Sequence, residues 1–289
     1  MALTMADYRT SEKSWWCPGC GDFGVLAALQ KALVELQIEP EKAAVVSGIG
    51  CSGKIGNYIN SYNLHVTHGR ALAAAQGLKL ANRELTVIAA GGDGDGFAIG
   101  MGHYMHALRR NVDITYIVMD NMIYGLTKGQ TSPTSEPGFK TKSTPAGNVE
   151  KSVNQLQLAI ASGCGFVAAG FSANQKQLVE IIKRAILHPG FSLVSTYSPC
   201  VTFNRVNTFD FFKQHLVNLD EDPTYDRHDR FAAMKKLMET EELVTGIIYE
   251  DPASVPYEDR VAGYRKEGIV NQDWTMDPAV WEQLVSQYR

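Results

Sequence analysis

Hydrophobic positions follow two alternating patterns along the chain up to about residue 200. Leu26, Leu29, Leu33 and Leu36 recur at helical spacing, whereas "AAVVSGIG" (43–50) is a continuous apolar run that predicts a buried strand. Further helices are predicted over 69–82, 98–111, near 151–162 and over 174–188, and further strands over 85–96, 113–121, near 165–169 and over 191–200. Continuous apolar strands separated by helices indicate an α/β fold, with a doubly wound, mostly parallel sheet covered on both faces.

Two segments depart from this pattern. Residues 125–150 form a long polar stretch rich in Gly, Pro, Ser and Thr, and ordered loops of that length are often functional. After residue 205 the strand–helix alternation fades, although 224–243 contains a helix. We therefore predict an α/β domain over 1–205 and a C-terminal extension over 206–289 that packs on this domain or on a partner subunit.

The composition is that of an ordinary globular protein. The 289 residues are 45% hydrophobic and 20% charged, with a formal net charge of −4, which gives no electrostatic reason to expect nucleic acid or an anionic membrane. No apolar run approaches the roughly 20 residues of a membrane-spanning helix. The N-terminus has no cationic segment followed by an apolar one, so we expect a cytoplasmic protein without a secretory signal.

Unusual residues follow several predicted strands at the point where each strand ends. In a parallel sheet, ligands gather beyond the carboxyl ends of the strands. The sequence therefore predicts one pocket at this edge, to which Cys17 and Cys20, at the start of the first helix, also belong. The loops that meet there are Gly48–Lys54, Gly91–Gly96, Asn121–Gln130 and Ser198–Cys200.

The loop "GGDGDG" (91–96) indicates a metal-bridged phosphate. Its glycines permit close backbone approach, and the following helix N-terminus offers N–H groups to an anion. Asp93 and Asp95 would repel a bare phosphate, so we expect a bridging Mg²⁺ ion that joins a carboxylate to the phosphate oxygens. Asn121, 28 residues after Asp93, offers a second oxygen ligand. Alone, Gly-Asp-Gly is also an ordinary turn. Neither a dinucleotide glycine fingerprint nor a Walker lysine motif is present.

Cys17, Cys20, Cys51 and Cys200 are predicted to converge on the same pocket. Four thiolates can hold zinc or an iron–sulfur cluster, and a Cys-x-x-Cys pair can also be a redox dithiol. Their spacing does not decide between these sites. The fifth cysteine, Cys164, is interpreted as a buried packing residue.

Gly-Asp-Gly followed by Asn121 resembles the diphosphate-binding signature of thiamine diphosphate enzymes. With "WCPGCGDFG", "GIGCSGK", "HGRALAAAQGLKLAN", "DNMIYGLTKGQTSPT" and "SPC", in this order over residues 12–205, the chain resembles the β subunit of 2-oxoacid:ferredoxin oxidoreductases. The resemblance implies that Mg²⁺ is held by Asp93, Asn121 and the backbone carbonyl of Ile123, and one [4Fe–4S] cluster by Cys17, Cys20, Cys51 and Cys200. It implies a cofactor wall made of Ile49, Gly50, Cys51, Ser52, His68, Gly92, Asp93, Gly94, Asp95, Asn121, Ile123, Tyr124, Gly125, Leu126 and Thr127.

The resemblance also implies partners. Thiamine enzymes need a glutamate beside the pyrimidine ring, and neither Glu84 nor Glu136 looks placed for that task. An α subunit with a pyrimidine-binding domain is therefore expected, in an αβ or (αβ)₂ assembly, with coenzyme A as co-substrate and ferredoxin as electron acceptor. The implied reaction is the reversible, CoA-dependent oxidative decarboxylation of a 2-oxoacid to its acyl-CoA and CO₂.

Lys128, in "GLTKGQ", bears on the substrate. A cation there suits the distal carboxylate of 2-oxoglutarate, which would give succinyl-CoA, but it would face the methyl group of pyruvate. In the family, glycine at this point is typical of pyruvate-type members. The alternatives left open are a solvated loop lysine, a pyruvate or broad-specificity enzyme, a non-redox thiamine decarboxylase subunit with a structural zinc, and a scaffold subunit.

Overall fold

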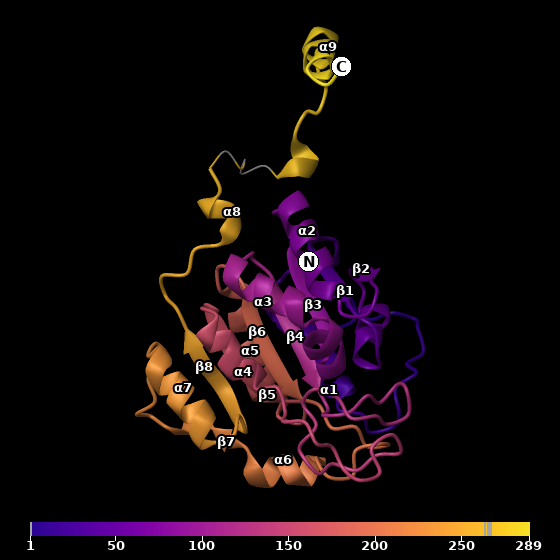
Figure 1. Cartoon of the computed structure of the whole chain (residues 1–289), viewed down its shortest axis with the longest axis vertical. Helices are drawn as coiled ribbons and strands as arrows, with labels where there is room; N and C mark the ends of the chain where they lie inside the picture. Colours follow the sequence, from indigo (N-terminus) through magenta and orange to yellow (C-terminus); the bar gives the residue numbers. More distant parts are fainter. Residues whose placement is uncertain (1, 263, 265–267) are drawn as a thin grey trace.

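A computed structural model describes residues 2–262, 264 and 268–289, so part of the predicted C-terminal extension lies outside the described residues. An eight-stranded sheet with the order β2-β1-β3-β4-β6-β5-β8-β7 forms its centre (Figure 1). The strands are β1 (Ala43–Ser47), β2 (Tyr62–His65), β3 (Thr86–Gly92), β4 (Thr115–Asp120), β5 (Phe166–Phe171), β6 (Ser192–Tyr197), β7 (Val217–Asn218) and β8 (Val244–Glu250). All neighbouring pairs are parallel except β5 and β8, which confirms the mostly parallel sheet.

Helices cover both faces of the sheet, as the apolar strands predict. Apolar side chains of α2, α3, α4, α6 and α7 share one buried cluster with one face of the strands, and those of α1 and α5 share a second cluster with the other face. The helices are α1 (Asp22–Glu35), α2 (Ala71–Ala81), α3 (Met101–Arg110), α4 (Gln155–Ala161), α5 (Gln175–Leu187), α6 (Phe209–His215), α7 (Arg230–Glu239), α8 (Tyr257–Arg260) and α9 (Pro278–Ser286).

Three strands were not predicted from the sequence: β2, β8 and the two-residue β7. β2 is exposed along its whole length at the sheet edge, so it lacks the apolar run that marks a buried strand. β8 is buried beside β5, so the region after residue 205 contributes to the core as well as to an arm. The alternation fades in the sequence because β7 has only two residues and leaves no apolar run, although β8 pairs with it in parallel and with β5 antiparallel.

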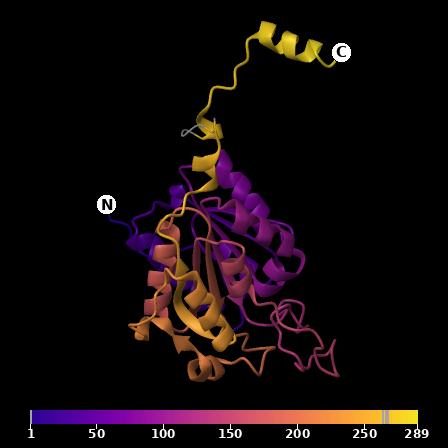
Figure 2. The ribbon, with the colours of Figure 1, turned by 60° about the vertical axis from the view of Figure 1, so that its left-hand side comes forward.

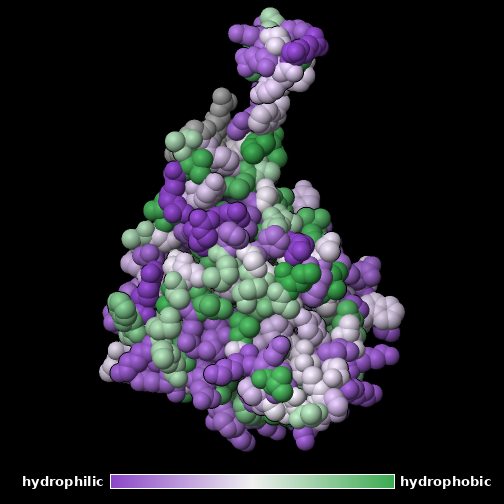
Figure 3. Space-filling model, in the orientation of Figure 1, coloured by the Kyte–Doolittle hydropathy of each residue, from purple (hydrophilic) through white to green (hydrophobic). Residues whose placement is uncertain are grey.

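The long polar loop and the C-terminal helix α9 lie at opposite ends of the molecule. The predicted 125–150 segment is a loop without helix or strand, and it lies at one end of the body (Figures 1 and 2). α9 lies away from the body at the opposite end. Hydrophilic and hydrophobic residues are interspersed over the face drawn in Figure 3. Among the described residues, no helix combines the length and apolar character needed to cross a membrane.

Candidate functional site

A cavity of about 510 Å³ opens beyond the carboxyl ends of β1, β3 and β4. The chain runs from β1 outward to β2 and then returns to β3 on the other side of β1, so the cavity lies at a topological switch point of the sheet. Every residue predicted to surround a cofactor lies on its wall: Ile49, Gly50, Cys51, Ser52, His68, Gly92, Asp93, Gly94, Asp95, Asn121, Ile123, Tyr124, Gly125, Leu126 and Thr127. Gln130, the last residue of the predicted loop, and Thr131, which was not predicted, complete the wall.

Glycines let the loops around this cavity close on one another. A Cβ atom on Gly94 would lie 2.2 Å from Cε1 of Tyr124, and one on Gly92 would lie 2.7 Å from Oγ of Ser52. The Tyr124 hydroxyl donates a hydrogen bond to the carbonyl of Gly94 across 3.2 Å. The Gly-Asp-Gly turn therefore packs directly beneath the loop that follows β4.

Asp93 and Asn121 place two oxygen donors at the ends of neighbouring strands. Both residues are buried, and burial raises the pKa of the Asp93 carboxyl. The Asp93 Oδ2 atom accepts a hydrogen bond from the Thr134 hydroxyl across 2.8 Å, and the Asn121 Oδ1 atom accepts one from the Ile123 N–H across 3.1 Å. Asp93 forms no ion pair with the described residues, and a desolvated carboxylate of this kind beside an amide oxygen fits the oxygen-rich coordination of Mg²⁺.

A metal ion here would not be held by carboxylates alone. Within the described part of the chain, no three His, Cys, Asp or Glu side chains form a ready-made metal site. A cation at Asp93 therefore needs amide, backbone and ligand oxygens to complete its coordination. This requirement matches a metal that binds together with a diphosphate.

Asp95 connects three loops at the wall of the cavity. Its Oδ1 atom accepts hydrogen bonds from the backbone N–H groups of Ile49, at 2.9 Å, and Gly69, at 2.8 Å. The same oxygen lies 2.9 Å from Nδ1 of His68. Asp95 thus joins the loop after β1, the His68 loop and the turn after β3, and its Oδ1 atom is occupied by protein donors.

The four predicted cysteine ligands are free thiols, and among the described residues they do not form a closed set of metal ligands. A Cβ atom on Gly125 would lie 3.5 Å from Sγ of Cys200 and 3.8 Å from Sγ of Cys51, so these two sulfurs flank the glycine at the cavity wall. The Cys17–Cys20 turn packs beside the Cys200 segment, because the N–H of Gly21 donates to the carbonyl of Pro199 across 3.2 Å.

The thiols are close enough to influence one another. Burial raises the pKa of the Cys51 thiol to about 11, and the nearby charges of Asp22 and Cys200 add to this effect. Burial also raises the pKa of Cys20, with further contributions from Asp22, Cys200 and Cys51. Mutual repulsion of this kind favours protonated thiols until a cation neutralises them, and metal binding would then release the protons.

His68, predicted beside the cofactor, and Lys128, predicted to meet the substrate carboxylate, differ in position. His68 lies on the cavity wall, whereas Lys128 is exposed and is not one of the residues that line the cavity. Lys128 has a φ of 74° in a tight turn, which the Gly129 N–H closes by donating to the Tyr124 carbonyl across 2.9 Å. The turn places Lys128 one residue beyond the wall residue Thr127.

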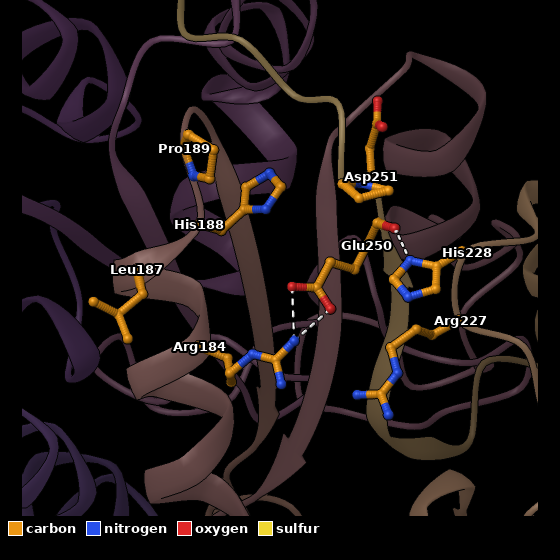
Figure 4. A pocket seen from close by; sticks show the side chains of 9 residues that line it. Arg184, Leu187, His188, Pro189, Arg227, His228, Glu250 and Asp251 are labelled. Atoms are coloured by element: carbon orange, nitrogen blue, oxygen red, sulfur yellow. Dashed lines mark hydrogen bonds and ion pairs between the residues drawn. The ribbon is translucent and has the colours of Figure 1, made fainter.

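A second pocket, of about 470 Å³, contains none of the predicted site residues (Figure 4). Arg184 points toward Glu250 and donates to both of its carboxylate oxygens, at 2.8 and 2.6 Å. His228 faces the backbone of the same glutamate, with Nδ1 2.7 Å from its carbonyl. Its lining includes none of the loops that follow β1, β3 and β4, so it is not the candidate site.

Comparison with known proteins agrees with this geometry. Residues 48–196 match the family "Thiamine pyrophosphate enzyme, C-terminal TPP binding domain", and residues 200–266 match the family of C-terminal regions of the pyruvate ferredoxin oxidoreductase beta subunit. The β subunit of 2-oxoacid:ferredoxin oxidoreductase 1 of Aeropyrum pernix is 46% identical over 268 residues, which are 89% of this chain and 84% of that one. The 2-oxoglutarate synthase subunit KorB of Archaeoglobus fulgidus is 46% identical over 233 residues, which are 76% of this chain and 86% of that one.

A solved structure extends the likeness to the whole fold. The 2-oxoglutarate:ferredoxin oxidoreductase of Magnetococcus marinus, determined with 2-oxoglutarate, coenzyme A and succinyl-CoA bound, superposes with a TM-score of 0.89 at 39% identity. The match covers 99% of this chain and 96% of that one. These similarities and the cavity at the switch point lead to one assignment: the chain belongs to the β subunits of the 2-oxoacid:ferredoxin oxidoreductases.

Proposed function

We propose that this chain binds thiamine diphosphate and Mg²⁺ in the cavity at the switch point and acts on 2-oxoglutarate. Together with an α subunit that carries the pyrimidine-binding domain, it would convert 2-oxoglutarate and coenzyme A to succinyl-CoA and CO₂, reversibly. Electrons would pass through a [4Fe–4S] cluster on this chain to ferredoxin. The observation that carries the proposal is the convergence of Asp93, Asn121 and the Cys51 loop on a single cavity.

In this proposal, different wall residues bind the metal ion and the diphosphate. Asp93, Asn121 and the carbonyl of Ile123 would ligate Mg²⁺, and the backbone of Tyr124–Thr127 would wrap the diphosphate. Bound thiamine diphosphate supplies the carbon nucleophile that decarboxylates 2-oxoacids. His68, whose Nδ1 lies beside Asp95, would offer its other ring nitrogen to the cofactor or substrate.

The cluster proposal rests on four cysteines from three separate segments. Cys51 and Cys200 flank Gly125 at the cavity wall, so a cluster there would lie next to the bound cofactor. Electrons released at the cofactor would then have a short path to the surface, where Cys17 is exposed. A structural zinc in a non-redox decarboxylase subunit is the alternative, since four thiolates suit both.

The choice of 2-oxoglutarate as substrate is supported by the relatives and by Lys128. Several relatives carry 2-oxoglutarate in their names, while others are named for 2-oxoacids in general. Lys128 favours the dicarboxylic substrate, because its turn begins at the cavity wall and its ammonium is exposed and free to reach a second carboxylate. A pyruvate or broad-specificity enzyme remains the second candidate.

The experiment is anaerobic co-production of this chain with its α subunit, followed by metal analysis and an assay. We expect a brown protein with about four iron atoms per β chain. We also expect CoA-dependent reduction of a low-potential dye that is fastest with 2-oxoglutarate among a panel of 2-oxoacids. Colourless protein with stoichiometric zinc would refute the electron-transfer function, and preference for pyruvate would refute the substrate assignment.

The fifth cysteine provides a matched control for the cluster. Cys164 is fully buried, and its thiol lies 3.2 Å from the carbonyl of Phe166, away from the other four. Cys17→Ser should lower iron content and dye reduction, while Cys164→Ala should retain the iron. Equal iron content in both variants would remove Cys17 from the cluster.

A further inference from the structure

Part of the long 125–150 loop returns to the protein interior. Ser132, Thr134 and Ser135 are 7%, 3% and 1% exposed, although each carries a hydroxyl group. Buried hydroxyl groups are destabilising unless they are hydrogen-bonded. The partners of these three groups therefore reveal what the segment does.

The Thr134 hydroxyl lies between two carboxyl groups at the ends of neighbouring strands, and its single proton can be donated to one of them at a time. Its Oγ1 atom is 2.8 Å from Oδ2 of Asp93, at the end of β3, and 2.8 Å from Oδ1 of Asp120, at the end of β4. Asp120 is itself fixed on its other side, because its Oδ2 atom accepts from the side-chain amide of Gln155 across 3.0 Å. Thr134 thus connects Asp93 to an anchored group in the core.

The same segment also holds the backbone after β4. The Ser135 hydroxyl donates to the carbonyl of Met122 across 2.7 Å and accepts from the N–H of Ser132 across 2.8 Å. Met122 has a φ of 56°, an unusual conformation for a methionine that needs such support. Residues 132–135 therefore contact both sources of the proposed metal ligands, the Asp93 carboxylate and the Asn121–Ile123 turn.

We propose that Thr134 is a positioning residue for the magnesium–diphosphate site, an inference that rests on the proposed function. Its hydroxyl holds the Asp93 carboxylate in place before the metal arrives and does not touch the metal itself. Groups that hydrogen-bond a metal ligand in this way set its orientation, and their loss typically weakens metal binding about 10- to 100-fold. Through Thr134, the long polar loop 125–150 would take part in metal binding.

The test measures Mg²⁺-dependent binding of thiamine diphosphate to the αβ complex, by quenching of tryptophan fluorescence. Thr134→Val keeps the side-chain shape but removes the hydroxyl, so the Mg²⁺ concentration at half-saturation should rise about 10- to 100-fold. Thr134→Ser restores the hydroxyl and should keep the midpoint close to that of the wild type. Thr144→Val is the matched control, since Thr144 lies in the same loop and its hydrogen bonds with described residues are all to neighbouring loop residues.

The outcomes separate this proposal from the proposed function. An unchanged Mg²⁺ midpoint in Thr134→Val would overturn the positioning role and leave Thr134 as a packing residue. Failure of the wild-type complex to bind thiamine diphosphate with Mg²⁺ would instead refute the proposed function. If the valine variant does not assemble, Thr134→Cys replaces it, because a thiol is a weak donor, and an unchanged midpoint there would equally overturn the proposal.

Discussion

The indole Nε1–H of Trp16 donates a hydrogen bond to the backbone carbonyl of Cys51 across 2.6 Å. The Trp16 ring is buried and packs edge-on against Tyr58 and Phe23, with ring centroids 4.8 and 5.2 Å apart. Its neighbour Trp15 is 80% exposed. Of the two tryptophans, Trp16 is therefore the one that holds the cysteine loop after β1.

Trp16→Phe should loosen that loop. The substitution keeps an aromatic ring but removes the donor to Cys51, and the lost hydrogen bond should lower the free energy of unfolding by about 1 kcal/mol. Iron should also be lost faster when the complex is exposed to air. Urea denaturation and iron release measure the two effects, and Trp15→Phe is the control that should change neither. Equal behaviour of the two variants would contradict the role of Trp16.

Gly48→Ala should disrupt the cavity through Asp95. A Cβ atom on Gly48 would lie 1.9 Å from Oδ2 of Asp95, and this carboxylate is held by the backbone of Ile49 and Gly69. Because the carboxylate cannot move without losing these bonds, we expect a destabilisation of about 1–3 kcal/mol and weaker binding of thiamine diphosphate.

The control for this prediction lies in α2. A Cβ atom on Gly77 would meet no heavy atom within 4 Å, and Ala is favoured over Gly inside a helix. Gly77→Ala should therefore stabilise the chain by about 0.5–1 kcal/mol, as measured by urea denaturation. A stability loss of similar size in both variants would mean that the contact with Asp95 is not the cause.

Glu242 should make stability depend on pH. Burial raises the pKa of its carboxyl to about 7, although the backbone N–H groups of Gln157 and Leu156 donate to it. The folded chain therefore binds a proton more tightly than the unfolded chain. The stability that this group contributes is complete below pH 4.5 and is lost as the pH rises through 7, by about 3 kcal/mol at most.

Glu242→Gln tests this pH dependence. The amide keeps an oxygen acceptor for the backbone of α4 but cannot ionise, so the decline in stability between pH 4.5 and 7 should become shallower. Urea denaturation at a series of pH values measures it. Parallel profiles for the variant and the wild type would assign the decline to other groups.

Lys128→Ala should affect 2-oxoglutarate far more than pyruvate. Loss of a charge-assisted hydrogen bond of about 1.5–3 kcal/mol raises KM for the dicarboxylic substrate roughly 10- to 100-fold. Steady-state kinetics with both substrates measures the difference. Lys140→Ala, on the same loop and also exposed, should leave both KM values unchanged. Equal effects of Lys128→Ala on both substrates would contradict the substrate assignment.

The sequence predicted much of the cavity because its signals are local. Asp93 and Asn121 follow apolar strands directly, and the parallel topology then brings the strand ends together. Thr134 carries no such signal: its contact with Asp93 depends on how a loop of irregular structure folds back. The hydrogen bonds of Asp95 to the backbone could not be predicted either. The sequence of a Gly-rich loop does not show whether its carboxylate faces a metal ion or backbone amides.

The position of β6 between β4 and β5 has a consequence for biosynthesis. Cys200 follows β6, and it reaches Cys51 only after β6 has paired with β4. The first three cysteines leave the ribosome long before the fourth, so the nascent chain cannot offer a complete set of ligands. If these thiols receive a cluster, the machinery that delivers iron and sulfide must recognise a chain whose central sheet has already formed.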